Sequence, residues 1–358
     1  MSEIKPIILI VSDIHVGSLD CEIDLFIQFL RKIINGVFGN ELQTLIIMGD
    51  FLDLCTDVPA NLLQDENVQE IFTLLLKIKE SLNLIFLLGN HEIPVTGDYD
   101  EKFKRREKKF LIKFKKLGSE DLFAENLYYQ YIILKKNNNE DQLFLYETRD
   151  QINRNPLAQI KVKGLELGDD FECLMAHGFQ FDSEIYRFFV GQLWKALISK
   201  NKFEIKETYD YFWNLVIKNG RKIKPITFKQ MKEELAKVKS IPMEEIDQLF
   251  SELSILEFNL IKVNMRIMKK WERASKPDYY NKEIKEFLED DGYKLSKINH
   301  VIYGHSHIKG ITYENINNTH VSITNSGSWQ HMQPSYVEIQ KKGKIILKLF
   351  NQQSIKYI

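Results

Sequence analysis

The sequence lacks the features that mark secreted and membrane-spanning proteins. Its three cysteines, Cys21, Cys55 and Cys173, are odd in number and show no CxxC spacing, so we expect reduced thiols and no disulfide framework. No uninterrupted apolar run approaches the roughly 20 residues that a membrane-spanning helix needs. The first residues show no signal-peptide pattern. We therefore expect a cytoplasmic protein without a transmembrane segment, for which peripheral membrane contact stays open.

An excess of charge of either sign is also absent. Lys and Arg number 49 and Asp and Glu number 50, which gives a formal net charge of −1. A nucleic-acid partner would therefore need a local basic patch. Residues 101–117 form such a stretch, in which lysines and arginines surround phenylalanines at helical spacing. An anionic substrate or a membrane surface could bind there, but we favour a solvated helix whose phenylalanines pack on the core.

Apolar runs and amphipathic segments alternate over the first 91 of the 358 residues. The apolar runs cover residues 6–11, 45–48 and 84–88, and residues 22–35 and 67–80 carry helical stripes. Strands that alternate with helices indicate a parallel sheet with crossover helices. Ligands of such sheets bind outside the carboxyl ends of the strands.

Clusters of carboxylate, amide and imidazole side chains follow the apolar runs. The clusters are Asp13-Ile14-His15, Gly49-Asp50-Phe51-Leu52-Asp53, Gly89-Asn90-His91-Glu92, His177-Gly178 and Gly304-His305-Ser306-His307. A turn or a helix N-cap would explain one such cluster, but explains three successive strand ends less readily. We therefore predict one dinuclear metal site at the strand ends.

The residue types in these clusters suit two divalent ions. Asp50 is the natural bridge, because one carboxylate can present an oxygen to each ion. The other ligands divide between the ions: Asp13, His15 and one of His305 and His307 for the first, and Asn90, His177 and the other histidine for the second. Mixed imidazole and carboxylate ligands suit Mn, our first choice, or Fe, Zn, Ni and Co, better than Ca or Mg. Two ions roughly 3.5–4 Å apart can hold a hydroxide and clamp a phosphoryl group.

Two further residues are candidates for proton transfer. His91 directly follows Asn90 and would point differently, so it could protonate the leaving oxygen or stabilise phosphoryl charge. Asp53 could orient and charge that imidazole. The alternatives are a packing role for His91 and a turn or helix cap for Asp53. The remaining histidines stand outside the clusters, and we expect structural roles for them: His300, His320 and His331.

The second half of the chain contains a long helical segment. Residues 129–175 read as strands, with a hairpin turn at 137–139. Residues 183–296 read as mostly helical and separate His177 from His305. We interpret them as an insertion in a core of residues 1–182 and 297–358. The insertion is either decoration or a cap that selects the substrate.

The motifs, in their order, resemble those of the calcineurin-like metallophosphoesterases. They are Asp-x-His, Gly-Asp-x-x-Asp, Gly-Asn-His-Glu, His-Gly and Gly-His-x-His, and the resemblance covers residues 7–91, 171–178 and 300–328. It implies an α/β fold, a four-layer αββα sandwich, which here carries a mostly α-helical insertion. It also implies the ligand sets Asp13, His15, Asp50 and His307 for one metal and Asp50, Asn90, His177 and His305 for the other. By the same resemblance His91 is the catalytic histidine, and Asn325 is a positioning residue of the final Asn-x-Gly-Ser element.

Departures from the family pattern make some substrate classes less favoured than others. Asp53 is followed by Leu54-Cys55 and not by Arg-Gly, which disfavours protein dephosphorylation. The helical segment after His177 is placed like the lid of the diacylglucosamine pyrophosphohydrolases, but His91 stands where those enzymes usually have arginine. We therefore predict a metal-dependent hydrolase of a phosphomonoester or phosphodiester, with attack by a metal-bridging hydroxide. The alternatives are a DNA or RNA phosphodiesterase that uses the basic stretch, and a non-enzymatic scaffold, which the complete ligand set disfavours.

Overall fold

The computed structural model describes most of the chain outside two long segments. The described residues are 4–18, 20–53, 65–89, 129–147, 149–181, 242, 244, 277–289, 295–330, 333–350 and 356–357. The residues group into two compact units, 1–178 with 284–358, and 179–283. The basic stretch at 101–117 and most of the predicted insertion at 183–296 lie outside the described residues, so these predictions and the domain boundaries stay predictions. No described helix is long and apolar enough to cross a membrane.

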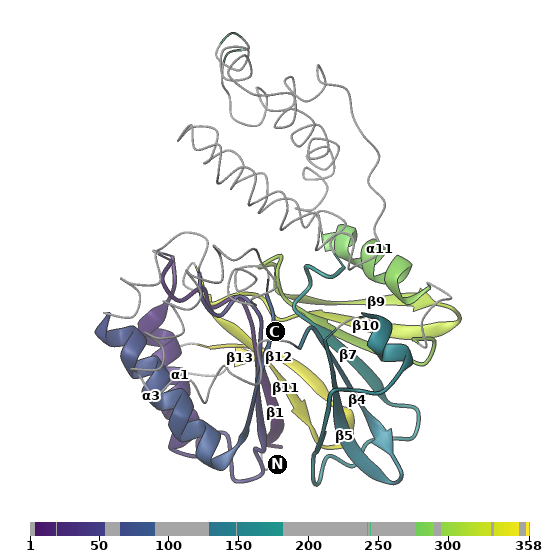
Figure 1. Cartoon of the computed structure of the whole chain (residues 1–358), viewed down its shortest axis with the longest axis horizontal. Helices are drawn as coiled ribbons and strands as arrows, with labels where there is room; N and C mark the ends of the chain where they lie inside the picture. The colour runs from purple at the N-terminus through teal and green to yellow at the C-terminus, as the bar shows by residue number, and fades with distance from the viewer. Residues whose placement is uncertain are drawn as a thin grey trace, which may run out of the picture. The chain divides into compact units, whose positions relative to one another are not determined.

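The first unit contains two mixed β-sheets (Figure 1). Among the described residues, the first sheet has six strands in the order β13-β12-β11-β1-β2-β3. Their bounds are β1 (Pro6–Val11), β2 (Thr44–Met48), β3 (Asn83–Leu87), β11 (Ser335–Gln340), β12 (Ile345–Leu349) and β13 (Lys356–Tyr357). β1, β2 and β3 run parallel, as the alternation of strands and helices predicts, whereas β11 is antiparallel to β1.

The second sheet has seven strands within the described residues, in the order β6-β5-β4-β7-β8-β10-β9. Their bounds are β4 (Tyr131–Asn137), β5 (Glu140–Tyr146), β6 (Ala158–Lys161), β7 (Glu172–Ala176), β8 (His300–Tyr303), β9 (Gly310–Ile316) and β10 (Thr319–Asn325). The predicted hairpin is confirmed, since β4 and β5 are joined by Asn138 and Asn139 at φ 49° and 65°, values that asparagine tolerates. β7, β8 and β10 are parallel neighbours, so their carboxyl ends meet at one edge.

The side chains of β1 alternate between two hydrophobic cores. Ile8 and Ile10 pack between the sheets, in one cluster with Met175 of the second sheet. Leu9 and Val11 pack on the opposite face, in the cluster that includes the helices described below. A strand that is buried on both faces reads as a continuous apolar run, which is how residues 6–11 appear in the sequence.

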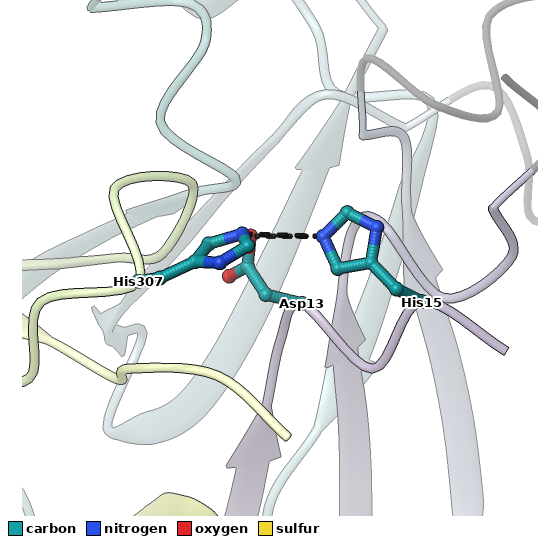
Figure 2. Close-up of side chains that lie close together, drawn as sticks. All are labelled: Asp13, His15 and His307. Atoms are coloured by element: carbon teal, nitrogen blue, oxygen red, sulfur yellow. Dashed lines mark hydrogen bonds and ion pairs between the residues drawn. The ribbon is translucent and has the colours of Figure 1, made fainter. Parts of the chain in front are cut away.

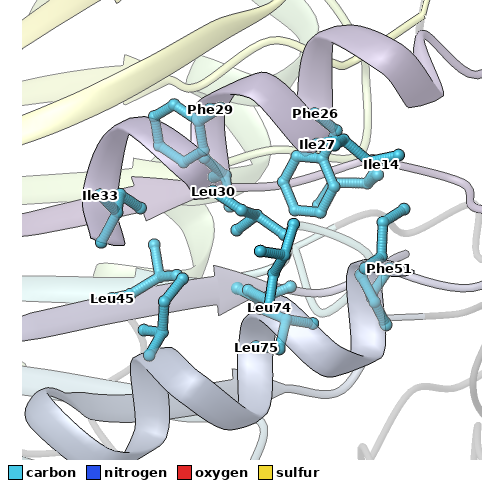
Figure 3. Close-up of a cluster of buried hydrophobic side chains, with 14 of the residues drawn as sticks. Ile14, Phe26, Ile27, Phe29, Leu30, Ile33, Leu45, Phe51, Leu74 and Leu75 are labelled. Carbon is cyan, nitrogen blue, oxygen red and sulfur yellow. The ribbon is translucent and has the colours of Figure 1, made fainter. Parts of the chain in front are cut away.

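Helices α1 (Ile23–Ile34) and α3 (Glu66–Ser81) cover the outer face of the first sheet (Figures 1 and 3). The buried stripe of α1 includes Phe26 and Phe29, and each such ring contributes about 1.5–3 kcal/mol by its burial. Asp65 caps α3, because its carboxylate accepts the backbone N–H groups of Asn67 and Val68. Both helices lie within a residue of the bounds that the hydrophobic period predicts.

Helix α11 (Pro277–Leu288) places its last turn on the outer face of the second sheet. The Phe287 ring stacks on Tyr131 at 6.0 Å between centroids, and Arg149 donates from Nη2 to the Phe287 carbonyl at 2.7 Å. Tyr131 points away from the core between the sheets, because its neighbour Ile132 belongs to that core. Helices α1 and α3 therefore lie outside the first sheet and the last turn of α11 lies outside the second, in the αββα order that the family resemblance implies. The described part of this unit also contains two short 3₁₀ helices, Arg149–Asn153 and Lys341–Gly343.

Candidate metal centre

All predicted ligands that the structure describes lie at the same end of the two sheets. They follow β1, β2, β7 and β8 directly: Asp13 and His15, Asp50, His177, and His305 and His307. The first three come from the first sheet and the others from the second, so the centre needs both sheets. Asn90 lies outside the described residues, and its role as a ligand stays a prediction.

Backbone hydrogen bonds hold these strand ends side by side. The N–H of Asp13 donates to the Gly49 carbonyl at 3.1 Å, and the N–H of His15 donates to the Asp50 carbonyl at 2.9 Å. In the second sheet, the N–H of Gly304 donates to the His177 carbonyl at 2.7 Å. The loops after neighbouring strands thus continue the pairing of the strands and set the spacing of the side chains.

The candidate ligands share a rare backbone conformation. Asp13, His15, Asp50, His305 and His307 have φ values between 48° and 65°. This left-handed region costs a non-glycine residue roughly 1–2 kcal/mol and is concentrated at functional sites. For His305 and His307 it replaces the extended strand in which both side chains would share one face. The bend lets the two histidines turn toward different partners.

One group of ligand atoms gathers around Asp13 (Figure 2). The Nε2 atom of His307 lies 3.3 Å from Asp13 Oδ1 and 3.2 Å from the Nε2 atom of His15. The third separation, from His15 Nε2 to Asp13 Oδ1, is 4.0 Å. Ligands on one ion with bonds of about 2.1 Å lie at similar separations from one another. The three side chains therefore fit a single divalent ion.

A second group consists of Asp50, His177 and His305. The Oδ2 atom of Asp50 lies 3.2 Å from His177 Nε2, and the rings of His177 and His305 are 5.2 Å apart between centroids. The same Asp50 oxygen lies 3.7 Å from the Nε2 atom of His15, in the first group. Asp50 thus stands between the two groups. This division of ligands is the one that the family resemblance implies for the described residues.

A hydrogen bond to the backbone fixes the orientation of the His177 ring. Its Nδ1 lies 2.9 Å from the Met48 carbonyl and donates to it, so Nε2 is the ring nitrogen that faces Asp50. Gly49 makes this contact possible, since a Cβ atom there would lie 2.5 Å from the His177 ring. Gly49 also has φ 85°, which glycine adopts without strain. The lack of space beside the His177 ring therefore explains why the Gly-Asp motif has a glycine at position 49.

The carboxylates of the centre are buried and charged. Asp13 is fully buried, which by itself raises its pKa, but His177 and His307 outweigh burial and bring the pKa to about 2. Asp50 is 1% exposed, and its negative charge opposes the ionisation of Asp13. Two buried carboxylates facing each other need cationic compensation. The donor chemistry and the burial both fit divalent cations.

The proposed proton-transfer pair is described only in part. Asp53 is buried, its N–H donates to the Val16 carbonyl at 3.0 Å, and it lies close enough to Cys21 to affect its thiol. Burial, Glu22 and Asp53 together raise the pKa of Cys21 to about 12. His91 lies outside the described residues, so the pairing of Asp53 with His91 stays a prediction.

Asn325 links the end of β10 to the loop that carries the two histidines. Its Nδ2 donates to the Ser306 hydroxyl at 2.6 Å, and its Oδ1 accepts the N–H of Gly327 at 2.8 Å. Ser306 stands between His305 and His307, so this contact holds the bent loop. The geometry supports a positioning role, which stays a proposal.

The other described histidines lie away from both groups. His300 is within 2.6 Å of the Ser322 hydroxyl, and its ring centroid is 4.7 Å from that of Phe171. His320 stacks on Tyr313 at 5.5 Å. His331 lies outside the described residues.

Ser12 is a site residue that the sequence patterns did not indicate. Its hydroxyl donates to Asp13 Oδ2 and lies 2.7 Å from the hydroxyl of Ser326. The available signal was its place, directly before Asp13 at the end of a buried strand. Its partner Ser326 stands directly after Asn325 in the Asn-x-Gly-Ser element.

The match to a protein family agrees with this geometry. The family model of the calcineurin-like phosphoesterases matches residues 7–309, from the first residues of β1 to the loop after β8. A solved structure of a dimetal phosphatase from Danio rerio is similar over 99% of this chain and 99% of that chain, at 10% identity and a TM-score of 0.42. No curated protein sequence matches the chain. The family match and the two residue groups together indicate two divalent metal sites in a metal-dependent phosphoester hydrolase, and the chain belongs to the calcineurin-like phosphoesterase family.

Proposed function

We propose that this chain hydrolyses a phosphomonoester or a phosphodiester with two divalent ions bound at adjacent sites. The observation that carries the proposal is the place of Asp50, whose Oδ2 lies 3.2 Å from His177 and 3.7 Å from His15. One carboxylate between two groups of ligands supports a shared, bridging ligand. Two ions, when bound, activate water for attack and neutralise charge on the phosphoryl group.

The proposed ligands follow the two groups. Asp13, His15 and His307 hold one ion, His177, His305 and Asn90 hold the other, and Asp50 binds both. Imidazole and carboxylate together favour Mn, Fe, Zn, Ni or Co, whereas Ca and Mg prefer oxygen ligands alone. We propose Mn as the first ion to test.

His91 is the proposed general acid, with Asp53 as its partner. The pairing of the strands supports this assignment. β3 runs parallel to β2 with Leu87 opposite Met48, so the chain leaves β3 beside Gly49 and Asp50. His91 follows four residues after Leu87, and Asp53 is buried three residues after Asp50. In this proposal His91 holds a proton toward the leaving oxygen, and the carboxylate of Asp53 keeps the imidazole charged.

Substrate selection is proposed to come from residues 183–296. The segment begins six residues after His177, so the chain leaves the core next to a candidate ligand. An insertion that starts at the site can cover a bound substrate and exclude water. The cytoplasmic location expected from the cysteine content is part of the same proposal.

The test is hydrolysis of paired chromogenic esters by the full chain. The protein is stripped with a chelator and given Mn²⁺, and its rates on p-nitrophenyl phosphate and bis-p-nitrophenyl phosphate are compared. We expect hydrolysis that requires metal and is lost in His305→Ala. His320→Ala is the matched control, because His320 stacks on Tyr313 and belongs to neither ligand group.

The same experiment separates the alternatives. A preference for one ester assigns the enzyme to monoester or diester hydrolysis. Equal rates in His305→Ala and the unmodified chain would contradict the proposed centre. Binding of two ions without turnover of any substrate would favour the scaffold. Single-stranded DNA and RNA are included as further substrates, and activity restricted to them would favour the nuclease.

A further inference from the structure

The two oxygens of the Asp13 carboxylate have different surroundings. The histidine Nε2 atoms approach Oδ1, at 3.3 Å for His307, 3.9 Å for His177 and 4.0 Å for His15. Oδ2 accepts the hydroxyl of Ser12, and it accepts the N–H of His305 at 2.9 Å. That N–H also lies 3.0 Å from Oδ1. Oδ1 is therefore the oxygen that faces the candidate metal centre.

Ser12 belongs to a buried network that joins the two sheets. It follows β1 and is 1% exposed, and its Oγ lies 2.7 Å from Ser326 Oγ and 3.2 Å from the Gly327 carbonyl. Ser326 Oγ in turn lies 3.1 Å from the Tyr303 carbonyl. Tyr303 ends β8 and Ser326 directly follows β10, so both lie at the edge of the second sheet that faces the centre. The Ser12 hydroxyl thus connects the two sheets that supply the candidate metal ligands.

The single proton of the Ser12 hydroxyl has a preferred acceptor. The charged carboxylate of Asp13 is a stronger acceptor than the neutral carbonyl of Gly327 or the hydroxyl of Ser326. Ser326 can then donate to Ser12 Oγ or to the Tyr303 carbonyl. In either arrangement the proton of Ser12 points at Asp13 Oδ2.

Gly304 preserves the space for this hydrogen bond. A Cβ atom at position 304 would lie 2.2 Å from Ser12 Oγ and 2.3 Å from Asp13 Oδ2. No side chain can therefore replace the hydrogen of Gly304 without displacing one of the two partners. This steric constraint is an observation separate from the hydrogen bond itself.

We propose that Ser12 is a positioning residue of the metal centre. Its hydroxyl holds Asp13 Oδ2, so that Oδ1 is the oxygen presented to the ion bound with His15 and His307. The proposal rests on the proposed function for the presence of that ion. Groups that orient a metal ligand typically change metal affinity by about 10–100-fold when removed. We expect Ser12→Ala to weaken Mn²⁺ binding at the Asp13 group by about tenfold or more.

The experiment is a calorimetric titration of the metal-free full chain with Mn²⁺, without any ester. Ser335→Ala is the matched control, because Ser335 is also 1% exposed and donates to the Ser326 carbonyl at 2.6 Å. Its removal takes a buried hydroxyl from the same network and leaves the Ser12 contact with Asp13. We expect the control to bind both equivalents of Mn²⁺ as tightly as the unmodified chain.

Two results would overturn the proposal. One is unchanged Mn²⁺ affinity in Ser12→Ala, and the other is an equal loss in Ser335→Ala, which would mean that any gap in the network has the same effect. Should Ser12→Ala not fold, Ser12→Cys serves instead, because a thiol has a similar size but is a weak donor. Unchanged affinity of that variant would also overturn the proposal.

The titration distinguishes this proposal from the proposed function. If the unmodified chain binds no Mn²⁺, both are wrong. If the unmodified chain binds two ions but hydrolyses no ester, the role of Ser12 is still decided by the affinities. Thermal unfolding of the metal-free variants serves as a readout of packing, and we expect Ser12→Ala and Ser335→Ala to lower the midpoint similarly.

Discussion

Carboxylates meet basic side chains at both ends of the second sheet, but in opposite environments. At the end where β7 and β8 finish, His177 is fully buried and lies against the buried Asp13 and Asp50. At the other end, beside the turn that joins β4 and β5, Lys136 pairs with Asp169 and Lys161 pairs with Glu140, each at 2.8 Å. These pairs stand largely in solvent, and among the described residues only the first end gathers carboxylates around imidazoles.

The difference shows that a short distance between charged side chains does not by itself make them a functional site. The exposed pairs, at 2.8 Å, are shorter than the 3.2 Å between Asp50 and His177, but water screens them and they contribute little to stability. The buried carboxylates have lost their hydration, and Asp13 and Asp50 repel each other. The neighbouring imidazoles outweigh both effects and hold the pKa of Asp13 at about 2. This end therefore keeps buried negative charge beside metal-ligating nitrogens, which is the physical sense in which it is specialised for binding cations.

The largest effect is expected at Asp50. Asp50→Asn replaces the anionic bridge with a neutral amide, so we expect loss of one or both ions and a fall in turnover of about a thousandfold or more. Metal content by mass spectrometry and hydrolysis of the preferred ester measure the two effects. Asp169→Asn, at the opposite end, is the control and should change neither. Two retained ions with near-normal turnover would disprove the bridging role.

His91→Ala tests the separation of metal binding from proton transfer. We expect turnover to fall by about 10²–10⁴-fold while metal content stays unchanged, because the general acid is lost and the ligands remain. Steady-state kinetics and metal analysis of the same preparation provide the measurement. Normal turnover would refute the assignment, and loss of an ion would make His91 a ligand.

An intermediate effect is expected at His300, which is partly buried at the start of β8, away from the centre. Burial lowers its pKa from 6.5 to about 4. Between these values the unfolded chain binds more protons than the folded one, so stability is full above pH 6.5 and is lost as pH falls toward 4. We expect the free energy of unfolding to fall by about 2–3 kcal/mol over this window through His300.

Denaturant unfolding of the unmodified chain and of His300→Gln at several pH values isolates that contribution. Glutamine keeps a polar partner for Ser322 but does not titrate, so the variant should show a smaller loss of stability on acidification. Identical pH dependence in both proteins would contradict the assignment. That result would show that burial does not lower the pKa of His300.

The smallest effect is expected at the exposed pair of β5 and β6. Removing it with Glu140→Gln and Lys161→Met should leave the thermal midpoint and the metal affinity unchanged within error, because solvent screens both groups. Thermal scans and the Mn²⁺ titration check this. A marked drop in either quantity would break the contrast between the two ends.

The sequence predicted the strands and the candidate ligands because both depend on local patterns. The apolar run before Asp13 and the glycine before Asp50 report a buried strand and a tight turn without reference to the rest of the chain. The parallel core of the first sheet follows from the alternation of strands and helices, whereas the αββα order was implied by the family resemblance. The roles of Asn90 and His91 were predicted by the same means and remain to be measured.

Contacts between distant segments could not be predicted in this way. The hydrogen bond between Ser12 and Ser326 joins residues 314 positions apart, and neither has a chemistry that stands out in a sequence. The left-handed backbone at Asp13 and His305 likewise depends on packing of one loop on another. The stacking of Phe287 on Tyr131, which places a helix on the second sheet, is a third contact of this kind.

The central claim is that Asp50 joins two metal ions, and electron paramagnetic resonance of the chain loaded with two equivalents of Mn²⁺ tests it most directly. Two ions that share a carboxylate interact magnetically, whereas separate ions each give the six-line spectrum of isolated Mn²⁺. We predict an exchange-coupled signal in the unmodified chain that is absent in Asp50→Asn. A six-line spectrum from the unmodified chain at two bound equivalents would contradict the account.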